Sequence, residues 1–319
     1  MFTERLCAGL NERGIRAAIT WLPLRAEYAP WSVPVPSPPA WANIVHVNSW
    51  LPPRFLPPDL PVLTTVHHCV HDPLLTPYKS CVQVHYHCLW IKRVEKALLN
   101  RSNRIVAVSR YTATAYENIF DLSGIEVIHN GVDTRRYHPT ERTSPNRPFR
   151  LLYVGNWIPR KGVDLLAPIM QALGDDFELA YTADRNGAHE RCPLPPNCRN
   201  LGRLSDPALV AAYQQADALL FPSRLEGFGL VAAEAMACGL PVIAARTSSL
   251  PEVVEDGVTG LLCPVDGIEA FVQAARTLTT DIARWRMMRQ AARQRVKTYF
   301  EIGTQISRYI ELYRIISKE

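Results

Sequence analysis

The chain lacks the features that would place it in a membrane or in an oxidising compartment. No apolar run reaches the length of about eighteen residues that a membrane-spanning helix needs. The first six residues, Met-Phe-Thr-Glu-Arg-Leu, have neither the apolar core nor the small-residue cleavage site of a signal peptide. The eight cysteines show no C-x-x-C and no regular spacing, which favours reduced thiols over a disulfide framework. These absences predict a cytoplasmic protein.

A strong charge of one sign is also missing. The formal net charge is +5, which favours anionic ligands or an anionic membrane surface but is too diffuse to indicate nucleic acid. With 319 residues, the chain is long enough to divide into two domains rather than to form one core. We therefore expect a two-domain protein that does not bind nucleic acid.

Apolar, β-branched runs alternate with helical patterns along the chain, as in parallel sheets wrapped by helices. The ranges predicted as strands are 15–21, 43–49, 62–68, 104–109 and 126–129 in a first sheet, and 150–154, 177–180, 218–221 and 241–245 in a second. Residues 140–150 are polar and broken by proline, like a linker. The sequence thus predicts an α/β protein with a first doubly wound domain over residues 1–138, a second over 139–298, and a C-terminal helix over 299–319.

The most informative stretch, residues 221–241, is a glycine loop that runs into a short helix. Gly227 and Gly229 let the backbone approach a ligand closely and take φ values that a side chain would forbid. The helix begins near Leu230, and its first turn offers unpaired N–H groups to an anion above the loop. Glu234 lies about one turn further on, where its carboxylate can accept hydrogen bonds from a pair of hydroxyls. A phosphate beside a diol is the chemistry of a nucleotide.

This stretch resembles the donor-site motif of the retaining family 4 glycosyltransferases, which have the GT-B fold of two Rossmann-like domains facing a cleft. The family pattern, E-G-F-G-L-x-x-x-E followed by A-M-A-x-G-x-P-V, is filled at every position by residues 226–242. Residues 154–162 match the family's V-G-R-x-x-x-x-K-G, except that Asn156 stands where arginine is usual. The resemblance covers almost the whole chain and is strongest after residue 125.

The resemblance implies a hexosyltransferase-like enzyme of cell-envelope polysaccharide biosynthesis. Such an enzyme moves a sugar from a nucleoside-diphosphate sugar to a glycan, lipid-linked or small-molecule acceptor with retention of configuration. It implies that Glu226 holds the donor sugar, Glu234 the ribose and Lys161 the diphosphate. His67, in a segment similar to the family's V-x-T-V-H, is expected to reach the sugar from the first domain, to which the terminal helix is expected to cross back. The expected catalytic residues are His67, Glu226 and Lys161, and the expected donor-binding residues are Gly155, Asn156, Arg160, Lys161, Arg203, Leu204, Glu226, Gly227, Phe228, Gly229, Leu230 and Glu234.

We expect no cofactor and no metal. No two aspartates have the D-x-D spacing with which metal-dependent glycosyltransferases hold an ion. Lys161, Arg160 and the helix terminus after Gly229 can stabilise the departing diphosphate instead. A structural zinc site is the alternative, although the spacing of its candidate ligands matches no standard closed site. Those candidates are His67, His68, Cys69, His71, Cys81, His85, His87 and Cys88.

Two alternatives to a glycosyltransferase stay open. The chain could be another GT-B enzyme, such as an epimerase or a phosphorylase, or a non-catalytic relative that binds nucleotide-sugar. Residues 88–104 form a basic amphipathic helix, which suits peripheral contact with anionic membrane but equally a solvated helix face. Oligomeric state is not indicated.

The start of the chain departs from the family pattern. Family members begin with a strand and a glycine-rich loop before the helix pattern L-x-x-x-L-x-x-R-G, whereas this chain begins inside that helix, at Leu6, Leu10 and Gly14. The resemblance therefore implies a first domain without its usual first strand, from a truncated or misplaced start or from a rearrangement. We expect that domain to be poorly stable and weakly active, while the second domain still binds nucleotide.

Overall fold

The structure is a computed structural model that describes residues 2–184 and 193–318. It contains two compact units, Met1–Asn130 with Ile302–Glu319, and Gly131–Glu301. The division falls at Asn130 rather than at 138, and before Ile302 rather than before 299. The reason is that the segment after residue 130 is bound to the second unit: the N–H of Val132 donates to the carbonyl of Phe300 at 2.8 Å, and Arg142 forms an ion pair with Asp217.

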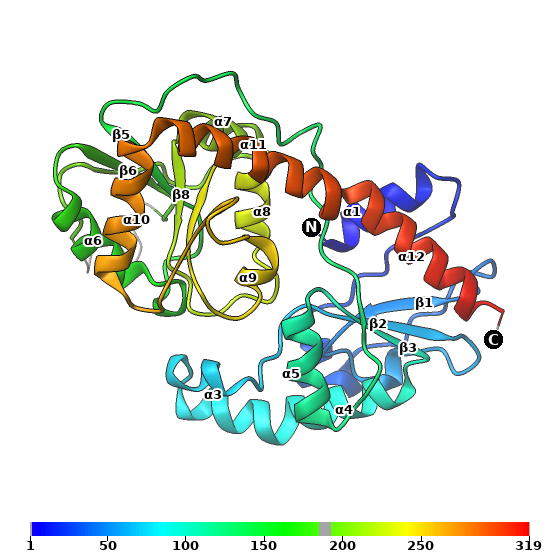
Figure 1. The fold of residues 1–319 in the computed structure, drawn as a ribbon. Helices are drawn as coiled ribbons and strands as arrows, with labels where there is room; N and C mark the ends of the chain where they lie inside the picture. The colour runs from blue at the N-terminus through cyan, green and yellow to red at the C-terminus, as the bar shows by residue number, and fades with distance from the viewer. Residues whose placement is uncertain (1, 185–192, 319) are drawn as a thin grey trace. The chain divides into compact units, whose positions relative to one another are not determined.

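Unit 1 contains a parallel sheet of four strands in the order β1-β2-β3-β4 (Figure 1). The strands are β1 (Val45–Asn48), β2 (Val62–Val66), β3 (Arg104–Ala107) and β4 (Glu126–Val127). All five residues of β2 are buried, as expected for a strand covered on both faces. The predicted ranges 43–49, 62–68, 104–109 and 126–129 therefore each contain a strand.

Two pairs of helices cover this sheet. Helices α1 (Phe2–Asn11) and α12 (Ile302–Ile316) share a buried cluster with Leu63 of β2. Helices α4 (Lys92–Arg101) and α5 (Arg110–Phe120) pack against Val66 and Ala107 through Leu99 and Tyr116. Helix α3 (Cys81–Tyr86) begins at a Ser80 capping box and continues through a π-helical turn, His87–Ile91, into α4. The short helix α2 (Arg25–Tyr28) lies in the segment between α1 and β1.

Residues 15–21 do not form the predicted strand. They have no regular secondary structure, and within the described residues the backbone from Ala18 to Leu22 makes no hydrogen bond. A strand exists only when its N–H and C=O groups pair with a neighbour, and an apolar pattern does not supply that neighbour.

Unit 2 contains a parallel sheet of six strands in the order β10-β9-β8-β5-β6-β7. The strands are β5 (Phe149–Tyr153), β6 (Phe177–Tyr181), β7 (Cys198–Asn200), β8 (Ala218–Phe221), β9 (Val242–Ala245) and β10 (Gly260–Cys263). The sequence predicted β5, β6, β8 and β9 but missed the two edge strands. The chain winds outward from β5 in one direction and then from β8 in the other, which is the doubly wound arrangement.

Helices cover both faces of this sheet (Figure 1). Helices α6 (Leu166–Leu173) and α10 (Ile268–Thr280) join the inward side chains of β5, β6, β8 and β9 in one buried cluster. Helices α7 (Asp206–Gln215) and α8 (Leu230–Ala237) lie on the opposite face, and α11 (Ile282–Tyr299) packs against α8. The four-residue α9 (Leu250–Val253) follows β9.

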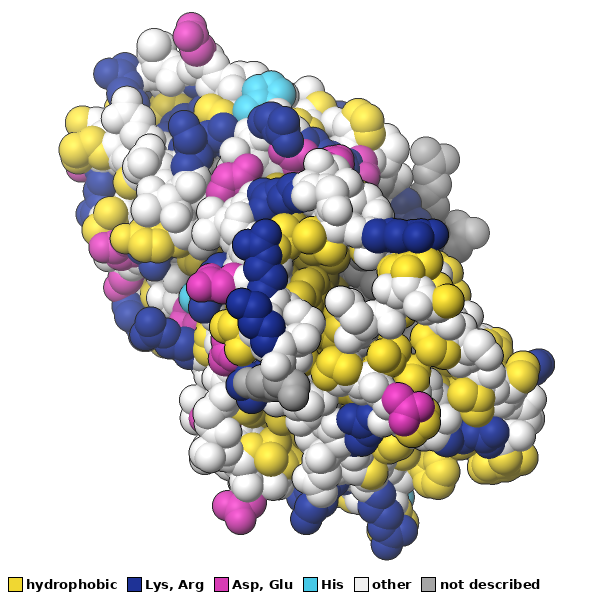
Figure 2. Space-filling view, turned by 90° about the vertical axis from the view of Figure 1, so that its right-hand side faces the viewer, with side chains coloured by type: hydrophobic (Ala, Val, Ile, Leu, Met, Phe, Trp, Pro, Cys, Tyr) yellow, Lys and Arg dark blue, Asp and Glu magenta, His cyan; other side chains and the backbone are white. Residues whose placement is uncertain are grey.

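Charged side chains of both signs lie on the face seen in Figure 2. Lys and Arg side chains are spread over this face, with Asp and Glu side chains between them. In the described part of the chain, none of the helices combines the length and the apolar character needed to cross a membrane.

Candidate functional site

Most of the predicted donor residues gather on two loops at the centre of the second sheet. The strand order reverses between β5 and β8, which are hydrogen-bonded neighbours. Because the strands are parallel, the loop after β5 (residues 154–162) and the loop after β8 (residues 222–229) leave from the same edge. Open α/β sheets bind ligands in the crevice at this reversal. The sheet topology thus brings the two sequence motifs together.

A lysine and a glutamate join the two loops. The Nζ of Lys161 donates to Oε1 of Glu226 at 2.5 Å, and the two side chains are 14% and 11% exposed. The same Nζ lies 5.8 Å from the centre of the Phe221 ring. Separating a pair this buried would leave each charge without a partner, which is costly. The two groups are therefore expected to stay in contact. Both predicted catalytic residues of unit 2 therefore lie in one contact.

Backbone contacts hold the two loops at a fixed distance. Arg160 donates from Nη1 to the carbonyl of Leu225 at 2.7 Å, and the N–H of Arg224 donates to the carbonyl of Arg160 at 2.9 Å. Gly162 has φ +70°, and a Cβ there would lie 2.2 Å from the carbonyl oxygen of Pro222. The loops can approach this closely only because residue 162 has no side chain. Asn156, which replaces the family arginine, is exposed on the first loop.

Arg224 links the loops of the candidate site, and no sequence motif points to it. Its guanidinium donates to both carboxylate oxygens of Asp164, at 2.7 and 2.6 Å, and to Asp266 at 2.6 Å. It also donates to the carbonyl of Pro159 at 2.5 Å. The hydrogen bond to Asp164 is the main reason that the pKa of Arg224 is raised. An arginine two residues before a motif glutamate carries no sequence signal for this role, since its partners come from other loops.

A third loop, after β9, fixes the backbone of Glu226. The N–H of Glu226 donates to Oγ of Ser248 at 2.9 Å, and Oγ of the buried Ser249 donates to the carbonyl of Glu226 at 3.0 Å. Ser248 has φ +48°, a conformation that costs energy for a residue with a side chain. The two serines thus bind the backbone of Glu226, while its carboxylate contacts Lys161.

Gly229 is the residue just before helix α8; it has φ +92° and gives no side-chain cap. A Cβ at Gly229 would lie 2.9 Å from Cδ2 of Leu250. Only Gly229 of the two loop glycines has a positive φ, so the prediction of such values for both was wrong for Gly227. The half-buried Leu230 opens the helix, and Phe228 is buried against Phe300 with ring centres 5.5 Å apart.

Glu234 lies just over one turn into α8 and is 4% exposed. The hydroxyl of Tyr213 donates to its Oε2 at 3.4 Å. Burial, together with the carboxylate, raises the pKa of Tyr213 well above its usual value, so this phenol stays protonated and can keep donating. Arg293 caps the other end of α8 by donating to the carbonyl of Ala237 at 2.8 Å. Glu234 is therefore held on a rigid, capped helix.

Arg203 and Leu204 lie apart from this centre. They follow β7, which is separated from β5 by β6. Arg203 is paired with Asp184 at 2.5 Å and its side chain is 87% exposed, while Leu204 is half-buried. The N–H of Gly155, at the start of the first loop, donates to Oγ1 of Thr182 at 3.2 Å, which ties that loop to the end of β6.

His67 belongs to unit 1, at the carboxyl end of β2. Its Nε2–H donates to Oδ1 of Asn48 at 3.1 Å, and its ring lies edge-on to Phe2 with centres 4.4 Å apart. Burial lowers the pKa of His67 to about 4, so the imidazole is neutral at neutral pH. A neutral imidazole whose Nε2 donates keeps Nδ1 as an acceptor.

Some of the candidate zinc ligands among residues 67–88 make other contacts. His71 contacts Oε2 of the buried Glu95 at 2.9 Å, Tyr116 donates to the other oxygen of Glu95 at 2.6 Å, and Nδ1 of His85 donates to the carbonyl of Cys81 at 2.8 Å. Among the residues described, no three His, Cys, Asp or Glu side chains are grouped so that they could hold a metal ion.

Two family matches cover more than half of the chain. Residues 40–136 match the family described as "Glycosyltransferase Family 4", and residues 148–281 match "Glycosyl transferases group 1". A glycogen synthase of Mycobacterium tuberculosis is 27% identical over 85% of this chain and 68% of its own length. A D-inositol 3-phosphate glycosyltransferase of Mycobacterium sp. (strain KMS) is 32% identical over 64% of this chain, which spans only 51% of that relative.

Solved structures show the same fold. Sucrose-phosphate synthase from Thermosynechococcus elongatus superposes with a TM-score of 0.73 at 24% identity, over 86% of this chain and 73% of its own. HepE from Anabaena, solved in complex with UDP and glucose, superposes with a TM-score of 0.66 at 22% identity, over 80% of this chain and 72% of its own. The chain therefore belongs to the GT-B glycosyltransferases, with a family 4 domain over residues 40–136 and a group 1 domain over residues 148–281.

Proposed function

We propose that this protein transfers a hexosyl group from a nucleoside-diphosphate sugar to a glycan, lipid-linked or small-molecule acceptor, with retention of configuration. The observation that carries the proposal is the Lys161–Glu226 pair at the strand reversal of the second sheet, beside the start of α8. HepE, which shares the fold, was solved with UDP and with UDP-glucose, which supports a nucleotide-sugar as donor.

The chemistry of the leaving group explains the residues of the site. When the sugar departs, negative charge develops on the diphosphate while the anomeric carbon becomes cation-like. Lys161 supplies a fixed positive charge, and the uncapped first turn of α8 supplies N–H donors. Glu226, 2.5 Å from Lys161, holds the lysine in position and is placed to accept hydrogen bonds from sugar hydroxyls. In this proposal Glu234 binds the ribose, and no metal is needed.

The acceptor side belongs to unit 1. In this proposal the neutral His67 contributes an uncharged hydrogen-bonding group to the sugar, since a cation there would oppose the developing positive charge of the anomeric carbon. Val82 and Leu89, on α3 and the π-helical turn, are 78% and 57% exposed, and exposed Lys92 and Lys96 follow them on α4. Apolar side chains next to lysines favour peripheral contact with anionic membrane, where a lipid-linked acceptor would lie.

The test is an assay of transfer. The full chain is incubated with a panel of nucleoside-diphosphate hexoses and glycan or lipid-linked acceptors, and the anomeric configuration of donor and product is read by NMR. Lys161→Met should lose activity at least tenfold, whereas Lys297→Met, an exposed lysine on α11, should keep it. Inversion of configuration contradicts the retaining mechanism. Nucleotide-sugar binding with neither transfer nor donor hydrolysis would favour the non-catalytic relative.

A further inference from the structure

The turn after β9 lies beside the loop that carries Glu226. Strands β8 and β9 are parallel and hydrogen-bonded to each other, so the loops that follow them leave from the same edge of the sheet. The N–H of Leu250 donates to the carbonyl of Thr247 at 3.1 Å, which closes a four-residue turn with Ser248 and Ser249 at its centre. This turn therefore borders the candidate donor site.

The conformation of Ser248 is one that a serine adopts only at an energetic cost. Ser248 has φ +48°, whereas Ser249 has φ −80° and ψ −7°. A positive φ at only the first of the two central residues is typical of a type II′ turn, in which glycine is preferred at that position. Glycine has no Cβ and would take this φ without the strain that serine meets. The fold of the turn therefore does not require a side chain at residue 248.

The three hydroxyls of this turn bind the backbone of the neighbouring loop. Oγ of Ser248 accepts from the N–H of Glu226 at 2.9 Å, and Oγ of Ser249 donates to the carbonyl of Glu226 at 3.0 Å. Oγ1 of Thr247 donates to the carbonyl of Arg224 at 3.2 Å. Both backbone groups of Glu226 are thus bonded to one turn, and the strained Ser248 supplies the acceptor for its N–H.

Glu226 is held at its backbone and at its carboxylate. The carboxylate contacts Nζ of Lys161 at 2.5 Å, while the two serines hold the N–H and the carbonyl. A glutamate side chain has several rotatable bonds, so the contact with Lys161 alone does not fix the backbone. When sugar hydroxyls compete with Lys161 for the carboxylate, the backbone contacts keep the residue in place. Groups that act on a substrate need such support from the residues around them.

We propose that Ser248 is a positioning residue of the transfer reaction: its hydroxyl, held in a strained turn, fixes the backbone of Glu226 so that the carboxylate meets the donor sugar in one orientation. The inference rests on the proposed function, in which Glu226 accepts hydrogen bonds from sugar hydroxyls. Strained residues of this kind cluster at functional sites, and relieving the strain should not harm folding. The hydroxyl should affect turnover rather than nucleotide affinity, because Lys161, the start of α8 and Glu234 bind the nucleotide in that proposal.

Two substitutions separate the hydroxyl from the strain. Ser248→Gly removes both, whereas Ser248→Ala removes the hydroxyl and keeps a Cβ at φ +48°. The melting temperature should therefore be higher in Ser248→Gly than in Ser248→Ala, by roughly 2–8 °C. Both variants should lose kcat at least tenfold and bind nucleoside diphosphate as the unmodified chain does. Asp121→Gly is the matched control: Asp121 has φ +56° at the end of α5 in unit 1, so this variant should gain stability and keep its kcat.

Hydrogen exchange of single amides tests the contact without a transfer assay. Exchange of the Glu226 amide should become at least tenfold faster in Ser248→Gly and in Ser248→Ala. The Leu250 amide, which closes the turn, should exchange as it does in the unmodified chain. If the unmodified chain transfers no sugar, the proposed function fails, and the exchange of Glu226 still decides whether Ser248 holds this residue.

Three results would overturn the inference. A nearly normal kcat in Ser248→Gly, with a loss in Ser248→Ala alone, would show that activity follows stability rather than the hydroxyl. Faster exchange at Leu250 as well as at Glu226 would show that the hydroxyl serves the turn and not Glu226. Unchanged exchange at Glu226 in both variants would show that Ser248 does not hold it.

Discussion

Substituting Gly162 tests whether the contact between the two central loops holds the site together. In Gly162→Ala the new Cβ would lie 2.2 Å from the carbonyl oxygen of Pro222, at a residue whose φ is +70°. The left-handed conformation costs alanine about 1–2 kcal/mol. Relieving the contact with a backbone atom costs about a further 1–3 kcal/mol, because the loop that carries Glu226 must shift. The total is about 2–5 kcal/mol.

Gly257→Ala is the matched control. Gly257 has φ +75° in the turn that leads into β10, and a Cβ there would meet nothing within 4 Å. This variant should therefore lose only the free energy that the left-handed backbone conformation costs alanine, about 1–2 kcal/mol. The difference in free energy of unfolding between the two variants, measured in urea, isolates the contact between the loops.

The affinity of both variants for a nucleoside diphosphate is measured as well. If residues 222–229 are displaced, the Lys161–Glu226 contact of 2.5 Å is lost and affinity for a nucleoside diphosphate should fall at least tenfold in Gly162→Ala. Gly257→Ala should bind as the unmodified chain does. Equal losses of stability in the two variants, with affinity unchanged in both, would refute the view that the loop contact builds the site.

Three further predictions concern binding, metals and pH. Glu234→Ala should weaken nucleoside-diphosphate binding by about 0.5–3 kcal/mol in calorimetric titration, while Glu226→Ala should mainly lower turnover; unchanged affinity in the first would remove the ribose role. Activity should survive excess EDTA, and a full loss restored by magnesium or manganese would show that a metal holds the diphosphate. Burial lowers the pKa of His67 from 6.5 to about 4, and that of His46 to about 3. The unfolded chain therefore binds more protons below pH 6.5, and unit 1 should lose stability as the pH falls from 6.5 to 4, by at most about 1.4 kcal/mol per pH unit for each histidine. A pH-independent melting curve over that range would contradict the assignment.

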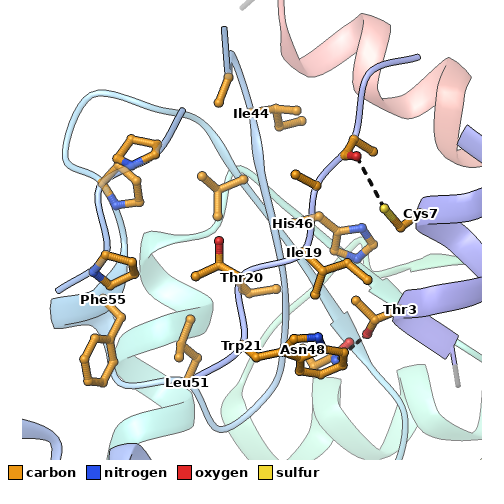
Figure 3. A pocket seen from close by; sticks show the side chains of 18 of the residues that line it. Thr3, Cys7, Ile19, Thr20, Trp21, Ile44, His46, Asn48, Leu51 and Phe55 are labelled. Atoms are coloured by element: carbon orange, nitrogen blue, oxygen red, sulfur yellow. Dashed lines mark hydrogen bonds between the residues drawn. The ribbon is translucent and has the colours of Figure 1, made fainter. Parts of the chain in front are cut away.

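The sequence predicted the strands that are both apolar and buried. It failed where the formation of a strand depends on whether a neighbouring backbone is available for hydrogen bonding. The range 62–68 contains β2 because this apolar run is hydrogen-bonded to a strand on each side, β1 and β3. Residues 15–21 have a similar composition, yet they form no strand because no backbone is available to bond them, and they line a pocket instead (Figure 3). The sequence missed the edge strand β7 (Cys198–Asn200), which has three residues and no apolar run, and the edge strand β10 (Gly260–Cys263).

The site could be predicted as a set of residues but not as a set of contacts. The motif at residues 226–234 names the glutamates, and the strand order explains why the loop of Lys161 lies beside them. The hydrogen bonds that fix these loops come from Arg224 and Ser248, which belong to no motif because their partners are distant in sequence. Such contacts depend on how separate loops meet.

The donor site is tested most directly by the affinity of the full chain for nucleoside diphosphates, measured by calorimetric titration over a panel of bases. We expect one preferred nucleoside diphosphate, bound at one site per chain. Its affinity should fall at least tenfold in Lys161→Met and remain unchanged in Lys297→Met. Binding that is equally strong in both variants, or no binding to any member of the panel, would contradict a donor site at the reversal between β5 and β8.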